Sequence, residues 1–365
     1  MIISRTPFRI SFFGGGTDYP AWYRKHGGSV IATAIDKYCY ISCRYLPPFF
    51  EHRFRVVYST IENCQTVDEI AHPAAREILR FMKIDRGVEI HHDGDLPARS
   101  GIGSSSSFTI GLLHVLHALK GEIVGKKQLA EEGIYIEQEV LKETVGSQDQ
   151  VLAAHGGFNQ IRFLLNGEIS VQPLTIRPER LEELNSHFLL FYTGIKRTAS
   201  QVAETYINHV EEKKRQFRIM GEMVNEAVEI LNSRRDIREF GKLLHEAWLA
   251  KKSLSQEVSN PDVQRIYEEA LASGGIGGKL LGAGGGGFML LFACPEDHEA
   301  IKNKLQHLIF VPFKFERSGS QIIYYDQEAD YSFEEKLRST QQIQRFRELN
   351  SISDLKEPRV QRRIL

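Results

Sequence analysis

The sequence has few cysteines and no long apolar run. No stretch approaches the roughly 18 apolar residues of a membrane helix, and Arg5 and Arg9 interrupt the apolar runs at the N-terminus, unlike the core of a signal peptide. A disulfide framework is not expected in a chain of 365 residues with only four cysteines, Cys39, Cys43, Cys64 and Cys294. We therefore expect a reduced, cytoplasmic protein.

An excess of charge of either sign is also lacking. The chain has 46 Lys and Arg against 47 Asp and Glu, a formal net charge of −1. No global field would attract nucleic acid or an anionic membrane, so we expect neither as a partner. Hydrophobic residues make up 42% and charged residues 25%, which is typical of a globular protein, and the length favours two packed domains.

The N-terminal half combines strand and helix patterns. Segments rich in β-branched and aromatic residues predict strands at 2–13, 29–46, 53–58 and 88–92. Apolar residues at helical spacing predict helices at 108–119 and 127–143. We place the end of this mixed unit near residue 180.

The second half predicts another α+β unit. It has buried strands at 187–192 and 288–292, a helix at 296–307, and further strands near Phe313 and Ile322 that would complete the unit. Long helical patterns fill the region between the first two strands. From Ser332 the sequence becomes a charged helical tail.

A glycine- and serine-rich loop, PARSGIGSSSS at 97–107, lies between a predicted strand and a predicted helix. Glycines let backbone N–H groups approach a phosphate, the helix N-terminus adds partial positive charge, and a serine hydroxyl could bind magnesium. A surface turn with serine caps is the structural alternative. Two other nucleotide motifs fail, because Ser106 replaces the third glycine of a dinucleotide fingerprint and Leu280 follows GGK at 277–279 where a Walker loop needs Ser or Thr.

Two more glycine-rich segments occur beside strand-like runs, TPFRISFFGGGTDY at 6–19 and KLLGAGGGGFMLLF at 279–292. With the central loop, their order and wording resemble the three signature motifs of the GHMP kinases, the family of galactokinase, homoserine, mevalonate and phosphomevalonate kinases. The resemblance covers roughly the first 325 residues. It implies an α+β fold with a ribosomal protein S5 domain 2-like ATP-binding domain at 1–180, a ferredoxin-like C-terminal domain at 181–330 and the tail at 331–365.

Finer wording resembles one group within the family. GGGTDY, GSSSS, VGSQDQ and FYTGIKRTAS are similar to segments of D-glycero-D-manno-heptose 7-phosphate kinases, which phosphorylate an anomeric hydroxyl. Kinases of fucose or galactose type share much of this wording, and a non-catalytic nucleotide or sugar-phosphate sensor on the same fold is a further alternative. The resemblance implies ATP and Mg²⁺ as cofactors and a sugar or sugar phosphate as substrate, and it is compatible with a homodimer.

The resemblance also assigns the catalytic pair and the nucleotide loop. Asp149 in VGSQDQ matches the catalytic aspartate, which would accept or align the proton of the acceptor hydroxyl, and Arg9 matches a cation that stabilises the transferred phosphoryl group. Considered alone, Asp149 could be a helix cap and Arg9 an exposed strand residue. The residues implied to hold ATP are Pro97, Ser100, Gly101, Ile102, Gly103, Ser104, Ser105 and Ser106.

Metal and acceptor residues follow from the same motifs. Magnesium would bind Ser105, or Ser104, together with Glu137, although Glu139 has similar spacing. Lys196 and Arg197, at a predicted helix start, would bind a phosphate of the acceptor, or would simply be solvated. The other residues implied to contact the acceptor are Gly15, Gly16, Asp18, Gly284 and Gly285.

Overall fold

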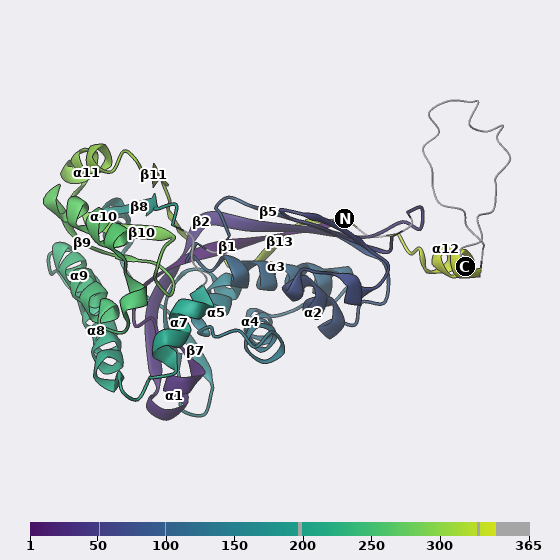
Figure 1. Ribbon diagram of the computed structural model, residues 1–365, viewed down its shortest axis with the longest axis horizontal. Coiled ribbons are helices and arrows are strands. Elements are labelled where there is room, and N and C mark those ends of the chain that lie inside the picture. The colour runs from purple at the N-terminus through teal and green to yellow at the C-terminus, as the bar shows by residue number, and fades with distance from the viewer. Residues whose placement is uncertain (51, 99, 196–198, 327–328, 341–365) are drawn as a thin grey trace.

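A nine-stranded sheet forms the larger part of the protein (Figure 1). The computed structural model describes residues 1–340 except 51, 99, 196–198 and 327–328. The sheet is built on two long antiparallel strands, β1 (Ile2–Phe13) and β2 (Gly28–Tyr45), and its main order is β13-β1-β2-β5-β3-β4. The other strands are β3 (Phe54–Val57), β4 (Ile61–Cys64), β5 (Val88–Gly94), β6 (Phe158–Phe163), β7 (Ile169–Pro173), β12 (Phe315–Glu316) and β13 (Gln321–Tyr325).

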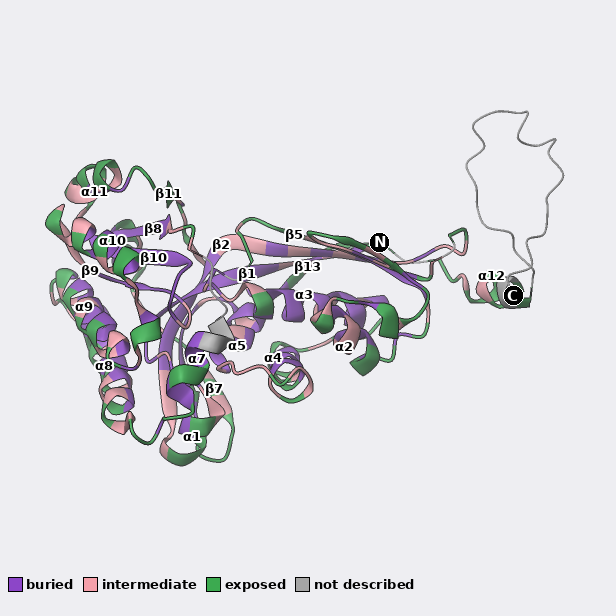
Figure 2. Cartoon of the chain, in the orientation of Figure 1, coloured by how far each residue is buried: buried purple, intermediate pink, exposed green. Residues whose placement is uncertain are grey.

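Helices gather below the sheet in the view of Figure 1. They are α2 (Pro73–Phe81), α3 (Ser104–Leu119), α4 (Lys126–Tyr135) and α5 (Gln148–His155). Helix α3 packs on β1 and β2 as well as on α4 and α5, so it is apolar around most of its circumference and largely buried (Figure 2). It begins at Ser104, four residues before the predicted start, because Gly103 in the left-handed region ends the loop.

The predicted helix at 127–143 is divided. After α4 the chain forms a π-helical turn, η2 (Ile136–Val140), in which the Leu141 N–H donates to the Ile136 carbonyl five residues earlier at 2.8 Å. A π turn widens the helix locally and is common at functional sites. This turn carries Glu137 into the protein interior, where its side chain is 1% exposed.

A second, four-stranded sheet has the order β11-β8-β10-β9. Its strands are β8 (Phe188–Tyr192), β9 (Gly275–Leu280), β10 (Phe288–Ala293) and β11 (Ile309–Phe310). The associated helices are α8 (Lys214–Asn232), α9 (Arg238–Lys252), α10 (Pro261–Ala272) and α11 (His298–Lys304). Every residue of β10 is buried, as its continuous apolar run predicts.

The strands predicted near Phe313 and Ile322 do not complete this second unit. Strand β12 pairs with β2, and β13 pairs with β1, so both belong to the first sheet. After the second sheet, the chain therefore returns to the first. Aromatic rings pack between the two sheets, because Phe12 stacks on Phe158 and on Phe188 with ring centroids 5.4 and 5.2 Å apart. The division at residue 180 stays a prediction.

The remaining elements are short. They are α1 (Pro20–His26), α6 (Pro178–Ser186), α7 (Ala199–Ile207), α12 (Ser332–Thr340) and the 3₁₀ turns η1 (Val67–Glu69), η3 (Gln256–Val258) and η4 (Pro295–Asp297). Helix α12 forms the start of the predicted tail and lies at the end of the first sheet remote from the second (Figure 1). None of the helices in the described ranges has the length and apolar character needed to cross a membrane.

Candidate active site

An arginine and an aspartate form the centre of the site. Arg9, in β1, donates from Nε to Asp149 Oδ1 at 2.7 Å and from Nη2 to Oδ2 at 2.6 Å, while Nη1 donates to the Gly101 carbonyl at 2.7 Å. The Asp149 side chain, in the first turn of α5, is 24% exposed. This planar two-point pairing fixes both groups, and the partly exposed carboxylate faces accessible space.

The central glycine loop passes directly over this pair. Gly103 has a φ of 75°, and a Cβ there would lie 3.1 Å from Arg9 Cγ and 3.5 Å from Asp149 Oδ2. The backbone N–H of Arg9 also donates to the Ile102 carbonyl at 3.0 Å. Glycine is therefore required at 103, because a side chain would displace the groups that the pair presents. Ser100, by contrast, stabilises the loop internally, donating from Oγ to the Pro97 carbonyl at 2.6 Å.

The first glycine segment buries a second aspartate. Asp18 is 1% exposed and accepts from the Gly16 N–H at 2.8 Å. Gly146 approaches so closely that a Cβ there would lie 1.8 Å from Asp18 Oδ2. Burial, followed by the negative charge of Asp149, raises the pKa of Asp18 to about 6. Two carboxyl groups thus lie in one site, and the buried Asp18 takes up a proton more readily than an ordinary aspartate.

Two unsatisfied polar atoms belong to side chains that lie near Gly15. The hydroxyl of Ser11 and the side-chain oxygen of Gln148 are buried and have no hydrogen-bond partner among the described residues. A Cβ on Gly15 would lie 3.6 Å from Ser11 Oγ and 3.8 Å from Gln148 Nε2, so both side chains border the space over this glycine. Buried polar atoms without partners are rare in a native protein and are candidates for ligand contacts.

Glu137 lies near the central loop. Its Oε2 accepts from Ser106 Oγ at 2.9 Å and from Gln150 Nε2 at 2.5 Å, whereas its Oε1 is buried without a partner in the described chain. Burial is the main cause that raises the pKa of Glu137 to about 8, and Glu143 adds to it. Of the two glutamates with suitable spacing, Glu139 is exposed and pairs with Lys142 instead.

The structure favours a different serine from the predicted one. Ser106 contacts Glu137, while Ser105 is exposed at the start of α3. The two are only one residue apart, but successive helical residues point about 100° apart, so sequence spacing could not separate them. A metal ligand among these serines stays a prediction.

The C-terminal glycine loop packs against the central loop. Cβ atoms on Gly282 and Gly287 would lie 2.6 Å from Gly101 Cα and 2.2 Å from the Ser100 carbonyl oxygen. The predicted acceptor residues Gly284 and Gly285 instead approach Val258: a Cβ on Gly284 would lie 2.8 Å from its carbonyl oxygen, to which the Gly285 N–H donates at 3.0 Å. The close approach of the two loops explains why small residues recur in this segment.

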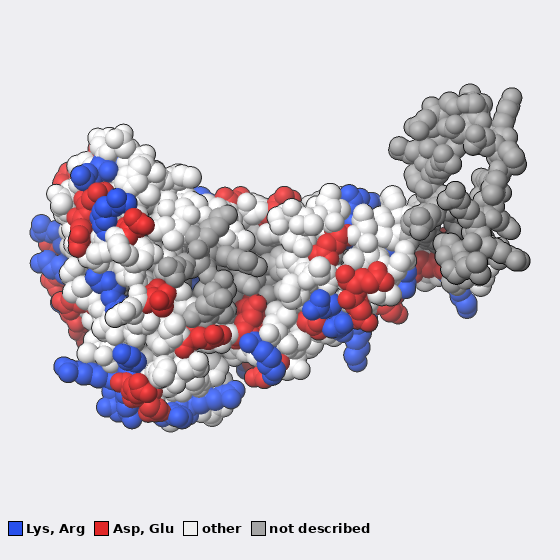
Figure 3. Space-filling view, in the orientation of Figure 1, with Lys and Arg blue, Asp and Glu red and all other residues white. Residues whose placement is uncertain are grey.

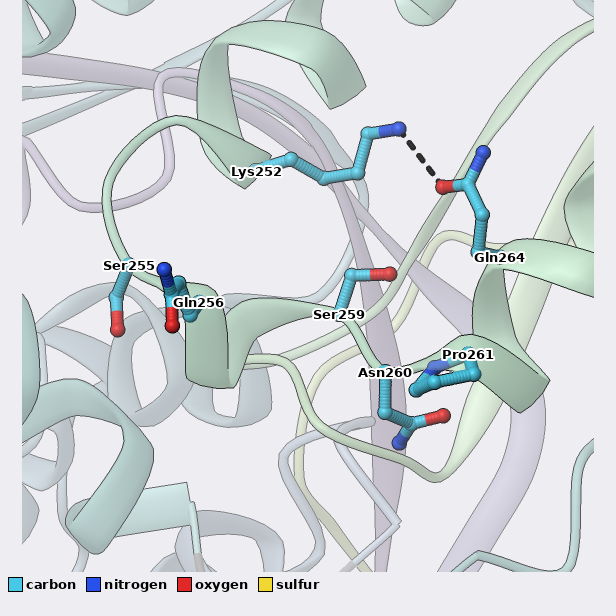
Figure 4. Close-up of a pocket in the computed structure, with 7 residues that line it drawn as sticks. All are labelled: Lys252, Ser255, Gln256, Ser259, Asn260, Pro261 and Gln264. Carbon is cyan, nitrogen blue, oxygen red and sulfur yellow. Dashed lines mark hydrogen bonds between the residues drawn. The ribbon is translucent and has the colours of Figure 1, made fainter.

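An open hollow lies between the end of α9 and the start of α10 (Figure 4). Its lining includes Lys252, which donates to Gln264 at 2.9 Å, and Asn260, whose side chain donates to the Gly285 carbonyl at 3.1 Å. None of the predicted catalytic residues lines this hollow. Lys196 and Arg197 lie outside the described residues, so the predicted phosphate contact stays a prediction.

Sequence reasoning missed several residues at the site. Gln148 adjoins Asp149 and Lys279 opens the third glycine motif, so motif position was an available signal for both. Ser11 also lies within the first glycine motif, whereas Lys251 had no such signal, because only the fold brings it to the carbonyls of Leu280 and Gly282 in the third motif. The exposed charges on the face shown in Figure 3 are mixed in sign.

Comparison with known protein families gives two matches in chain order. Residues 68–157 match the N-terminal domain of the GHMP kinases, and residues 212–308 match the GHMP kinase C-terminal domain. The first match contains the central loop, Glu137 and Asp149.

Individual kinases and a solved kinase structure are also similar to this chain. A D-glycero-alpha-D-manno-heptose 7-phosphate kinase from Campylobacter jejuni is 30% identical, covering 80% of this chain and 90% of that protein. An L-fucokinase/L-fucose-1-P guanylyltransferase from Bacteroides fragilis is 27% identical, covering 80% of this chain but 34% of that protein. The crystal structure of a D-glycero-D-manno-heptose 1-phosphate kinase from Bacteroides thetaiotaomicron has the same fold, with a TM-score of 0.73 and 22% identity, covering 89% of this chain and all of that one.

Proposed function

The chain belongs to the GHMP kinase family, and we propose that it is an ATP-dependent sugar kinase that phosphorylates the anomeric hydroxyl of D-glycero-D-manno-heptose 7-phosphate. The product would be the 1,7-bisphosphate, a precursor for nucleotide-activated heptose. The observation that carries the proposal is the two-point Arg9–Asp149 pair beneath the central glycine loop. It provides a carboxylate, a fixed cation and a backbone cradle at one place, as phosphoryl transfer requires.

In the proposed reaction, the acceptor oxygen forms a bond to the γ-phosphorus while the bond from that phosphorus to the β,γ-bridging oxygen breaks. Asp149 aligns the hydroxyl and accepts its proton, and ADP leaves with the bridging oxygen. Arg9 keeps Asp149 oriented and places positive charge beside the phosphoryl oxygens as they move. Positioning and charge stabilisation account for most of the catalysis in such a step.

Magnesium fits the residues near the loop. Glu137 supplies a buried carboxylate oxygen without a partner, and Ser106 or Ser105 supplies a hydroxyl. These are hard oxygen donors, and Mg²⁺ commonly binds through one or two protein groups plus phosphate oxygens. When bound, the cation would neutralise charge on the nucleotide phosphates.

A hydroxyl-rich acceptor is supported by the site itself. Asp18, Ser11 and Gln148 offer buried acceptor or donor atoms around Gly15 and beside Asp149. Several such groups suit a sugar, which presents hydroxyls in several directions, better than an apolar acceptor. This argument supports the sugar class equally for heptose, fucose and galactose.

An acceptor panel tests the proposal. ADP release should be measured with heptose 7-phosphate, the same heptose without phosphate, fucose, galactose and mevalonate. We expect the highest kcat/KM with heptose 7-phosphate, and Arg197→Ala should lower that value far more than the value for unphosphorylated heptose, by a gap of about 1.5 to 3 kcal/mol. Equal use of both heptoses would favour the fucose- or galactose-type alternative, and ATP binding without turnover of any acceptor would favour the sensor.

A further inference from the structure

Two lysines are buried behind the glycine loops. Lys251, near the end of α9, donates from Nζ to the carbonyls of Leu280, at 3.2 Å, and Gly282. Lys279, in β9, donates from Nζ to the Phe12 carbonyl of β1 at 2.9 Å. Each residue is only 7% exposed.

Neither lysine has an acid at ion-pair distance in the described ranges. The charged groups that act on Lys251 are Lys279, Arg9 and Asp18, and those that act on Lys279 are Arg9 and Asp18. Burial, reinforced by the neighbouring cations, lowers the pKa of Lys279 to about 7 and that of Lys251 well below its usual range. Buried ammonium groups are costly without a counter-charge, so this arrangement is poorly compensated in the ligand-free protein.

The pair lies close to the nucleotide loop. Lys251 binds the Gly282 carbonyl, and Gly282 packs so tightly on the central loop that a Cβ there would lie 2.6 Å from Gly101 Cα. The Gly101 carbonyl in turn accepts from Arg9. An anion held by the central loop would therefore lie in the electric field of both lysines and Arg9.

We propose that Lys251 and Lys279 form a buried cationic pair whose counter-charge is supplied by the phosphates of the bound nucleotide, so that nucleotide binding is accompanied by proton uptake. The proposal rests on the proposed function, since it takes the central loop to hold ATP. A nearby anion stabilises the ammonium form, and a lysine that is mostly neutral before binding then takes up a proton. The lysines act at a distance on the phosphates and orient the glycine loops, so they are positioning residues.

Calorimetry measures this proton directly. Wild-type protein should be titrated with a non-hydrolysable ATP analogue and Mg²⁺ at pH 8, in buffers of different ionisation enthalpy, because the dependence of the heat on that enthalpy gives the number of protons taken up. We expect wild type to take up about 0.5 to 1 proton more than Lys279→Met. Lys251→Met should also take up fewer protons than wild type. Contributions from Asp18 and Glu137 are common to all the proteins and cancel in these differences.

The matched control is Lys252→Met. This lysine follows Lys251 in the chain but lies at the open hollow and donates to Gln264 (Figure 4), so its variant should match wild type. Lys279→Gln removes the charge while keeping an N–H donor, and it replaces Lys279→Met if the latter does not fold. Equal proton numbers in wild type and in the folded charge-deleted variants would overturn the proposal.

A second measurement needs no variant. In the absence of Mg²⁺, which would displace the proton of Glu137, proton uptake requires the affinity of wild type for the nucleotide to fall as the pH rises from 7 to 9, by up to about tenfold per pH unit for one proton. An affinity that stays constant or rises over this range would contradict the proposal. Absence of binding heat in wild type at any pH would instead contradict the nucleotide assignment, so the two failures are distinguishable.

Discussion

Asp149 and Glu137 are two acids of the same site with opposite surroundings. Both oxygens of Asp149 accept from Arg9, and its carboxylate is partly exposed. Glu137 is fully enclosed, has one oxygen without a partner in the described chain, and has a pKa raised to about 8. The side of the site that holds Asp149 is therefore organised before any ligand arrives, whereas the side near Ser106 has a buried carboxylate oxygen that a proton or a cation would satisfy.

The largest expected effect comes from changing Asp149, on the side of the site where Arg9 holds the carboxylate in place. Asp149→Asn keeps the size of the side chain but removes the charge that holds Arg9 and that accepts the proton in the proposed reaction. We expect kcat to fall by roughly 10² to 10³, equivalent to about 2.7 to 4 kcal/mol in the activation free energy, with the affinity for ATP close to that of wild type. Steady-state rates together with calorimetric ATP binding measure both quantities.

A suitable control is Asp262→Asn, which alters an exposed aspartate in the first turn of another helix, α10. It should leave the rate unchanged. An Asp149→Asn protein with more than about a tenth of the wild-type rate would show that another group activates the acceptor.

The second-largest expected effect comes from changing Glu137, on the side of the site near Ser106. Glu137→Gln preserves the shape and one oxygen but cannot carry a negative charge to a cation. We expect the apparent affinity for Mg²⁺ to fall about 10- to 100-fold, and the rate to recover at high Mg²⁺. Activity measured across a Mg²⁺ series gives this shift.

Glu139→Gln is the matched control, because Glu139 lies on the same turn but is exposed and paired with Lys142. If Glu139→Gln shifts the Mg²⁺ dependence and Glu137→Gln does not, the other register of the predicted metal site is correct.

The burial of Glu137 also predicts that the stability of the folded protein depends on pH. The folded-state pKa of Glu137, about 8, lies above its unfolded value near 4.5, so folding favours the protonated form. This contribution to stability is complete below pH 4.5 and is lost as the pH rises to 8. Asp18, with a pKa raised to about 6, acts in the same direction over a lower range.

Thermal unfolding without metal should therefore show a midpoint that falls more between pH 5 and 8 in wild type than in Glu137→Gln, because the opposite contributions of Lys251 and Lys279, whose pKa values are lowered, are common to both proteins. The Asp18 contribution should persist in that variant. A fall of the same size in both proteins would mean that Glu137 is ionised in the folded state.

Most of the residues at this site could be predicted from short sequence motifs and spacings. Arg9, Asp18 and Asp149 each belong to a short motif, whereas Glu137 was predicted from its spacing to Asp149. Strand β1 was predicted at its observed bounds, Ile2–Phe13, because its composition is strongly β-favouring. Ser106, by contrast, was distinguished from Ser105 only by the direction in which the helix points each side chain.

Features formed by distant segments were not predictable in this way. The last strands return to the first sheet because β13 pairs with β1 across more than 300 residues, and no local pattern encodes the choice of sheet. Lys251 reads as an ordinary basic residue at the end of a helix, and it becomes buried only because α9 packs on β9 beneath the glycine loop.

The smallest expected effect tests whether the space over Gly15 receives a hydroxyl of the acceptor. Gly15 is not in the left-handed region, and the atoms nearest to an added Cβ are Ser11 Oγ at 3.6 Å and Gln148 Nε2 at 3.8 Å, both ordinary contacts. Gly15→Ala should therefore fold normally while its methyl group covers the buried polar atoms. Losing one neutral hydrogen bond of about 0.5 to 1.5 kcal/mol corresponds to a KM for the sugar raised by roughly 2- to 13-fold.

The effect should be confined to the acceptor, because Gly15 lies on the side of Asp18 and Gln148 and not on the central loop. The affinity for ATP and the thermal midpoint should match those of Gly125→Ala, a control at a glycine with open space around it. An unchanged KM for the sugar would mean that its hydroxyls do not reach Ser11 and Gln148. A rise in the KM for ATP instead would mean that the nucleotide, and not the acceptor, occupies the space over Gly15. The side of the site near Asp149 would then not be the acceptor side.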